Sequence, residues 1–204
     1  QQHLVIPRAA VKAGVNRVEL QFQAPVAVAG RALTRYRDRE DGAQYLYSLF
    51  VPADASSVFP CFDQPDLKAR FSLSLQMPAK WRAVSNAPAL EEAPGRARFA
   101  DTEPIPTYLF AFAAGPYVRV TGAKGSLPIS YWVFPADVPH AERSFSKTRE
   151  IIEFFNQELG FPYPWPKYDQ ITIPDFGGGA ESTNATLIGD KTIHDARAEQ
   201  DFPS

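Results

Sequence analysis

The chain has 204 residues and a formal net charge of −2, with 45% apolar and 22% charged residues. This balance is typical of a globular protein, and a chain of this length can bury a sizeable core. The near-neutral charge, without any block of basic residues, gives no electrostatic basis for binding nucleic acid or an anionic membrane. Cys61 is the one cysteine of the sequence, which excludes an internal disulfide.

The sequence shows no targeting or membrane signal. No run of about 18 apolar residues predicts a membrane-spanning helix. The first ten residues have no long apolar stretch of the kind that a signal peptide needs, and the chain begins with Gln1 instead of Met. We therefore expect a segment of a longer protein, and the compartment stays open between cytoplasmic and exported.

Four segments before residue 120 have patterns typical of β-strands. In residues 17–23 and 70–77 apolar and polar side chains alternate, as in a strand with one buried face. Residues 45–51 and 107–114 are rich in aromatic side chains, which favour strands. Turn-forming dipeptides lie between the strands, namely Asp41-Gly42 and Pro94-Gly95. Short strands separated in this way predict an antiparallel sandwich.

The pattern changes after residue 121. Gly122 and Gly125 indicate a connection between two domains in residues 121–127, followed by a predicted strand at 129–134. A single long helix is predicted from side chains repeated at helical spacing, with Asp137 positioned to cap its start and Gly160 to end it. The side chains of this stripe are Phe145, Thr148, Ile152, Phe155 and Leu159.

A glycine-rich segment, Gly177-Gly178-Gly179-Ala180-Glu181, lies between predicted strands at 169–173 and 186–188. The plain interpretation is a flexible hairpin. A phosphate-binding loop is not indicated, because no Gly-Lys-Ser or Gly-Lys-Thr follows. The functional interpretation is that the missing side chains let an extended peptide pair with this backbone, and that the Glu181 carboxylate binds a cationic amino terminus.

The residues supply no recognisable catalytic or metal-binding set, so we predict no catalytic residue and no metal ligand in this chain. The histidines His3, His140 and His194 are not spaced as two ligands on one helix turn, and H-E-x-x-H is absent. The polar residues near the end are interpreted as a solvated tail: His194, Asp195, Glu199 and Asp201. Cys61 has no cue for a histidine partner and is interpreted as a packed structural thiol.

Two motifs resemble a known family. Residues 59–71, Phe-Pro-Cys-Phe-Asp-Gln-Pro-Asp-Leu-Lys-Ala-Arg-Phe, form an aromatic-rich turn in which Asp63 suits a structural role. They resemble the F-P-C-F-D-E-P-x-x-K-A-x-F signature of the aminopeptidase N family of zinc metallopeptidases, the gluzincins. Residues 176–188, Phe-Gly-Gly-Gly-Ala-Glu-Ser-Thr-Asn-Ala-Thr-Leu-Ile, resemble the G-A-M-E-N or G-G-M-E-N exopeptidase motif of that family.

The resemblance implies a mainly β fold. Residues 1–122 would form an antiparallel, saddle-like β-sandwich N-terminal domain, and residues 123–204 would begin a mixed α/β, thermolysin-like catalytic domain. It also implies a zinc-dependent aminopeptidase that removes N-terminal amino acids from peptides, with its zinc ligands downstream of this chain. We therefore expect zinc in the intact enzyme, peptides with a free amino terminus as substrates, and no zinc and no activity in this chain alone. The competing interpretation is a non-catalytic scaffold or interaction module.

The resemblance assigns substrate binding to Glu181, Gly178, Gly179 and Ala180. Glu181 matches the motif's Glu, which binds the free α-amino group, and the other three match positions whose backbone lines the substrate strand. Ala180 and Ser182 stand where the motif has Met and Asn, and the smaller residue at 180 implies a wider pocket for the first side chain. The family's second amine anchor, Gln or Glu, would align with Val51, where neither stands.

Overall fold

The computed structural model describes residues 3–28, 30–39, 42–122, 125–174 and 176–193. Its strands are β1 (Leu33–Arg37), β2 (Gln44–Ser48), β3 (Ser74–Gln76), β4 (Arg82–Ser85), β5 (Ala89–Ala93), β6 (Arg96–Phe99), β7 (Phe112–Gly115), β8 (Val118–Thr121), β9 (Ile129–Val133), β10 (Tyr168–Ile173), β11 (Gly179–Ala180) and β12 (Ala185–Gly189). The α-helices are α1 (Val138–Ser144) and α2 (Thr148–Glu158). Short 3-10 helices span Arg8–Ala10, Ala55–Ser57, Thr107–Leu109, Pro135–Asp137 and Asp190–Thr192.

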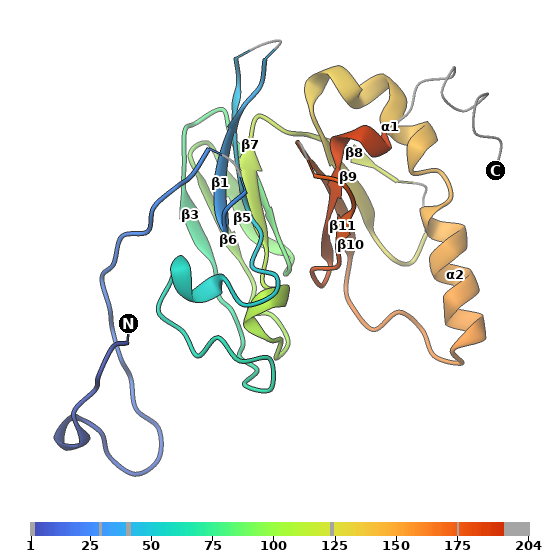
Figure 1. Cartoon of the computed structure of the whole chain (residues 1–204). Helices are drawn as coiled ribbons and strands as arrows, with labels where there is room; N and C mark the ends of the chain where they lie inside the picture. The colour runs from blue at the N-terminus through green and yellow to red at the C-terminus, as the bar shows by residue number, and fades with distance from the viewer. Residues whose placement is uncertain (1–2, 29, 40–41, 123–124, 175, 194–204) are drawn as a thin grey trace.

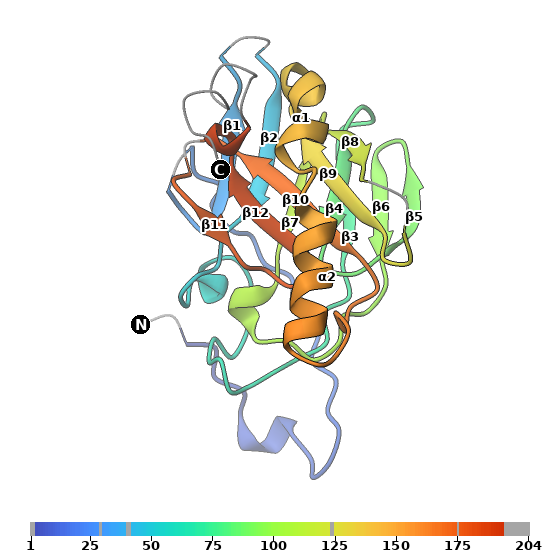
Figure 2. The ribbon, with the colours of Figure 1, turned by 90° about the vertical axis from the view of Figure 1, so that its right-hand side faces the viewer.

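The strands form three sheets that lie side by side as layers (Figure 1). A four-stranded sheet in the order β1-β2-β7-β4 is the middle layer. A three-stranded sheet in the order β3-β6-β5 covers one of its faces, and a five-stranded sheet in the order β11-β12-β10-β9-β8 covers the other. Helices α1 and α2 cover the face of the five-stranded sheet that points away from the four-stranded sheet, and they lie in front of the sheet in Figure 2. The mainly β fold class expected from the sequence is confirmed.

The two smaller sheets form the predicted antiparallel sandwich. In residues 70–77 every apolar side chain is half-buried and every polar one is exposed, as the alternation predicted. The ring of Phe71 stacks on that of Phe110 with centroids 4.4 Å apart, and this contact belongs to the core between the sheets. The predicted turns contain Gly42 and Gly95, whose positive φ values of 70° and 78° are accessible to glycine without steric cost.

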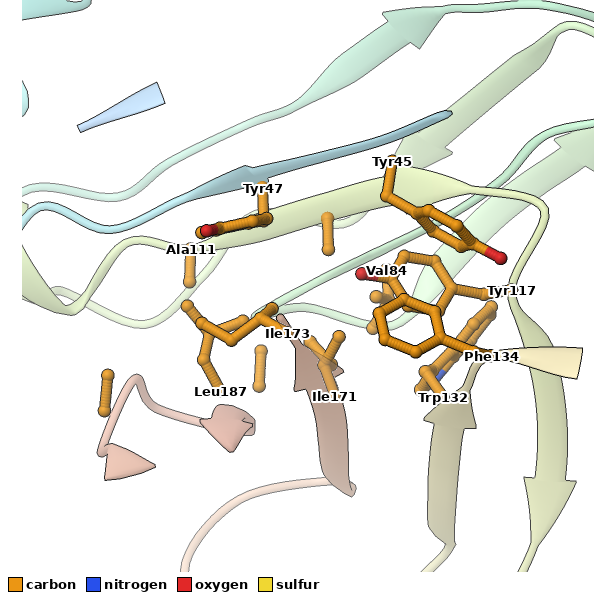
Figure 3. Packing of buried hydrophobic residues seen from close by; sticks show 13 residues of the cluster. Tyr45, Tyr47, Val84, Ala111, Tyr117, Trp132, Phe134, Ile171, Ile173 and Leu187 are labelled. Carbon is orange, nitrogen blue, oxygen red and sulfur yellow. The ribbon is translucent and has the colours of Figure 1, made fainter. Parts of the chain in front are cut away.

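An aromatic and aliphatic cluster joins the four-stranded sheet to the five-stranded sheet (Figure 3). Tyr45 of β2 packs edge-on against Phe134, which follows β9, with ring centroids 4.6 Å apart. Ile171 and Ile173 of β10 and Leu187 of β12 are fully buried in the same cluster. Because β7 and β9 are covered on both faces, all of their residues are buried, as is usual for strands in the middle of a layered fold.

The five-stranded sheet is mixed. Strand β10 runs parallel to both of its neighbours, β9 and β12, while β8 and β11 are antiparallel. The segment 121–127, expected to connect two domains, begins at the last residue of β8 and ends shortly before β9, and these two strands pair with each other in this sheet. The chain therefore enters the five-stranded sheet at Val118. The division into domains at 1–122 and 123–204 stays a prediction.

The strand predicted at residues 17–23 is absent from the described structure. This segment has no regular secondary structure, and its alternating apolar side chains Val18, Leu20 and Phe22 are 52%, 41% and 55% exposed. An extended segment becomes a strand only where a second strand takes up its backbone hydrogen bonds, and within the described residues none pairs with it. The predicted strand at 107–114 is also shorter: Thr107–Leu109 is a 3-10 turn, and β7 begins at Phe112.

The predicted single helix is two helices. The chain leaves helical geometry at Phe145, whose carbonyl oxygen accepts a hydrogen bond from the Tyr131 hydroxyl at 2.9 Å and whose ring stacks on that of Tyr131. Asp137 precedes α1, as expected, but its side chain makes no capping hydrogen bond. Gly160 ends α2 with a φ of 72°, as predicted. Neither helix in the described ranges is long and apolar enough to span a membrane.

Candidate functional site

The glycine-rich segment forms an edge of the five-stranded sheet (Figure 2). Gly179 pairs with Ile188 and Ala180 pairs with Leu187 in antiparallel register. The pairing continues to Gly178, whose carbonyl oxygen accepts a hydrogen bond from the Gly189 amide at 3.0 Å. In the part of the chain that the structure describes, β11 pairs with β12 alone. Its other edge is therefore suited to the addition of an extended peptide.

The glycines of this hairpin differ in the room around them. A Cβ placed on Gly177 or Gly178 meets no atom within 4 Å. A Cβ placed on Gly189 would overlap the carbonyl oxygen of Phe176. Packing within the hairpin therefore requires glycine at position 189. At Gly178 the space is open, and a second backbone could approach closely there.

We expect Gly189→Ala to lower the free energy of unfolding by about 1–3 kcal/mol, because its methyl group would push against backbone and not against a flexible side chain. Gly178→Ala is the matched control, with no atom near its Cβ and no positive φ, and should cost less than about 1 kcal/mol. Urea unfolding measures both. Equal losses in the two variants would show that the Phe176 contact does not constrain position 189.

Glu181 follows directly after β11, and its side chain is exposed. No salt bridge or side-chain hydrogen bond from another described residue reaches its carboxylate. A carboxylate of this kind at the end of an open edge strand is chemically suited to an ammonium group, which offers three hydrogen-bond donors and one positive charge.

Ala180 and Ser182, on either side of Glu181, are buried. The methyl group of Ala180 packs in the cluster between the sheets, so the smaller residue at this position fills core space in this chain. Any contact of Ala180 with a bound peptide would therefore use its backbone, as a strand-pairing role requires. The assignment of Gly178, Gly179, Ala180 and Glu181 to substrate binding stays a prediction.

The loop after Glu181 is anchored by residues that the sequence did not single out. Asn184 is buried with a positive φ of 63°, a conformation that Asn tolerates better than most residues. Its carbonyl oxygen accepts a hydrogen bond from the Asp169 amide at 3.0 Å. Its side-chain oxygen accepts a hydrogen bond from the Tyr163 hydroxyl at 3.0 Å. The one available signal was an Asn in a predicted hairpin loop.

Lys167 lies at the junction of the sandwich and the five-stranded sheet. Its ammonium pairs with the Asp169 carboxylate and donates a hydrogen bond to the Ser85 carbonyl oxygen at 2.6 Å. Both side chains of the pair are largely buried. Burial lowers the pKa of Lys167, and the charge and hydrogen bond of Asp169 act in the opposite direction. The pair thus joins two layers at a point with little access to water.

The segment 59–71 has the structural role expected for it. The Asp63 carboxylate accepts hydrogen bonds from the Ser56 amide at 2.9 Å and from the Thr107 hydroxyl at 2.6 Å. Cys61 packs against the neighbouring apolar cluster. Burial, and secondarily the negative charge of Asp63, raises the pKa of the Cys61 thiol to about 11. The thiol is therefore protonated near neutral pH and unsuited to act as a nucleophile.

Val51 is 41% exposed and follows β2 in a turn, so it is not a core strand residue.

A set of three potential metal ligands is not found among the described residues. The tail residues His194, Asp195, Glu199 and Asp201 lie outside those residues, and their interpretation as a solvated tail stays a prediction.

Comparison with known proteins identifies the chain. Residues 1–109 match the Peptidase M1 N-terminal domain, and residues 143–201 match the Peptidase family M1 domain. Both matching models describe domains of peptidases, so the chain is of the peptidase class. More particularly, the chain belongs to the peptidase M1 family, which confirms the resemblance found in the sequence.

Three curated relatives of this chain are aminopeptidases. The chain is 34% identical to aminopeptidase N of Streptomyces lividans over 171 residues, which cover 80% of this chain and 20% of that protein. It is 35% identical to glutamyl aminopeptidase of Bos taurus over 135 residues, 63% of this chain and 14% of that protein. For endoplasmic reticulum aminopeptidase 1 of Mus musculus the identity is 33% over 152 residues, 71% and 16% of the two chains. The chain spans a fifth or less of these relatives.

Proposed function

We propose that this chain is part of a zinc-dependent aminopeptidase that removes N-terminal amino acids from peptides, and that it supplies recognition of the substrate's amino group. The observation that carries the proposal is the exposed Glu181 carboxylate at the end of an edge strand whose glycines leave room for a second backbone. The names of the three relatives described above, each an aminopeptidase, support the same reaction.

In this proposal the peptide adds to β11 as a further strand. Main-chain hydrogen bonds align the substrate, and the Glu181 carboxylate pairs with its terminal ammonium. A peptide with further residues before this position would present an uncharged amide to the carboxylate in place of an ammonium. The negative charge of Glu181 would then stay unpaired. Glu181 therefore fixes which peptide bond is presented, which is a positioning role and not a bond-breaking one.

The described residues do not fit a zinc site. None of them forms a group of three His, Cys, Asp or Glu side chains, and the 204-residue sequence has no H-E-x-x-H pattern. Zinc ligands of the intact enzyme would come from other parts of the protein.

We expect this 204-residue chain, purified and dialysed, to retain less than stoichiometric zinc and to leave an alanyl anilide uncleaved. The full-length protein should retain zinc and cleave it. Metal analysis and release of the aniline, measured side by side on both proteins, test this. Zinc and hydrolysis in the short chain would refute the assignment of the zinc ligands to other parts of the protein. A full-length protein that does neither would favour the non-catalytic scaffold.

A further inference from the structure

The side chain of Asn86 links the loop that carries Glu181 directly to the sandwich. Asn86 follows β4 and is 1% exposed. Its amide nitrogen donates hydrogen bonds to the carbonyl oxygens of Leu109, at 2.8 Å, and of Thr183, at 2.7 Å. Its amide oxygen accepts a hydrogen bond from the Ala111 amide at 2.7 Å. Asn86 therefore uses both donors, with two partners in the sandwich and the third in the glycine-rich hairpin.

Two further side chains, Tyr163 and Lys167, contact the same loop at Asn184. The Tyr163 hydroxyl donates to the Asn184 side chain. The Lys167 ammonium, paired with Asp169 and bonded to the Ser85 carbonyl, lies 3.4 Å from the Asn184 carbonyl oxygen. The backbone at 183 and 184 is thus held between the four-stranded sheet and the five-stranded sheet.

Glu181 itself has no such restraint. Its carboxylate is exposed and has no partner among the described residues, so its position depends on the backbone that carries it. Thr183 is two residues from Glu181 in the sequence, so their Cα atoms lie at most about 7 Å apart. A hydrogen bond that fixes the Thr183 carbonyl therefore limits how far the Cα of Glu181 can move relative to the sheets.

We propose that Asn86 is a positioning residue for substrate-amine recognition, acting through the loop 181–184 on the Glu181 carboxylate. This inference rests on the proposed function of Glu181. A carboxylate held in place before the peptide arrives loses less conformational freedom on binding than one on a loose loop. Loss of the Asn86 link weakens selection of the free amine without removing any group that touches the substrate.

A double-mutant cycle in the full-length protein tests the proposal. The variants are Asn86→Ala, Glu181→Ala and the combination, assayed for kcat/KM on alanyl anilide and on its amino-acetylated form. We expect Asn86→Ala to lower kcat/KM for the free amine about 10-fold, since one buried hydrogen bond is lost at the loop. In the Glu181→Ala background the same change should have almost no further effect, because the group that it positions is gone.

Ser48→Ala is the matched control for the loss of a buried hydrogen bond within the sandwich. The Ser48 hydroxyl bonds the backbone of Phe112 through donor and acceptor and does not touch the loop. It should lower Tm without changing the ratio between the free and acetylated substrates. Should Asn86→Ala not give folded protein, Tyr163→Phe removes a single hydroxyl contact to Asn184 and should give the same non-additive pattern with about a 3-fold loss.

The outcomes separate the two ideas. If Glu181→Ala leaves the preference for the free amine unchanged, the proposed function is wrong. If Glu181→Ala removes that preference but the effects of Asn86→Ala and Glu181→Ala multiply independently, then Asn86 supports the fold alone and the positioning role is overturned.

Discussion

Glu181→Ala in the full-length protein is expected to lower kcat/KM for substrates with a free amino terminus by about 10- to 100-fold. A hydrogen bond between a carboxylate and an ammonium contributes on the order of 1.5–3 kcal/mol, which corresponds to that range. Glu181 is exposed in this structure, so a bound peptide would itself have to exclude water from the ion pair. A short substrate excludes less water, and its loss of kcat/KM is therefore expected to be about 10-fold.

Two variants sharpen this experiment. Glu181→Gln keeps the size and one acceptor oxygen but removes the charge, so it should fall between Glu181→Ala and the unchanged protein. Glu158→Ala removes an exposed carboxylate at the end of α2 and controls for the change in net charge. Amino-acetylated substrates, where they react, should be nearly insensitive to all three changes. The same loss for free and acetylated substrates would show that Glu181 does not recognise the amine.

Asp169→Ala is expected to lower the free energy of unfolding of this chain by about 3–5 kcal/mol, because it leaves the Lys167 cation buried without its partner. Burial already holds the pKa of Lys167 below its ordinary value. Without the Asp169 carboxylate, the pKa of Lys167 in the folded state should fall further below its value in the unfolded state. The deficit should therefore be largest at low and neutral pH and shrink as the pH rises toward the ordinary lysine range.

Urea unfolding at neutral and alkaline pH measures this effect. Glu150→Ala is the matched control, because it breaks the Lys147–Glu150 pair, which has a contact of 2.9 Å but lies on the surface. It should cost less than about 1 kcal/mol and show no recovery at alkaline pH. Lys167→Met combined with Asp169→Leu should cost less than Asp169→Ala, since neither charge is left alone. A loss in Asp169→Ala no larger than that in Glu150→Ala would mean that water reaches Lys167.

The sequence predicted the fold where local pattern and tertiary packing agree. The alternation in residues 70–77 and the glycines at 42 and 95 depend on near neighbours, and each appears in the structure as expected. Residues 17–23 have an equally good alternation but remain unpaired in the described structure, because pairing depends on a partner that the pattern does not contain. The break at Phe145 likewise comes from Tyr131, a residue of another element.

The site was predictable only in part for the same reason. A glycine-rich hairpin followed by Glu181 is visible in the sequence, and the structure places it on a sheet edge. Asn86 and Lys167 gave no signal, because their partners in the loop are backbone carbonyl groups, which every residue carries. The contact between Asn86 and Thr183 joins positions 97 residues apart, and no spacing rule covers such a distance.

The two-part helix has a consequence for the local stability of the molecule. In α2 the side chains of Thr148 and Ile152 contact the five-stranded sheet, whereas those of Phe154 and Phe155 are more than half exposed. A helix of 11 residues is marginal without tertiary contacts. The second half of α2 is therefore expected to open more often than the buried strands beside it, which native-state hydrogen exchange would register as amides that exchange sooner in the last turns of α2 than in β10.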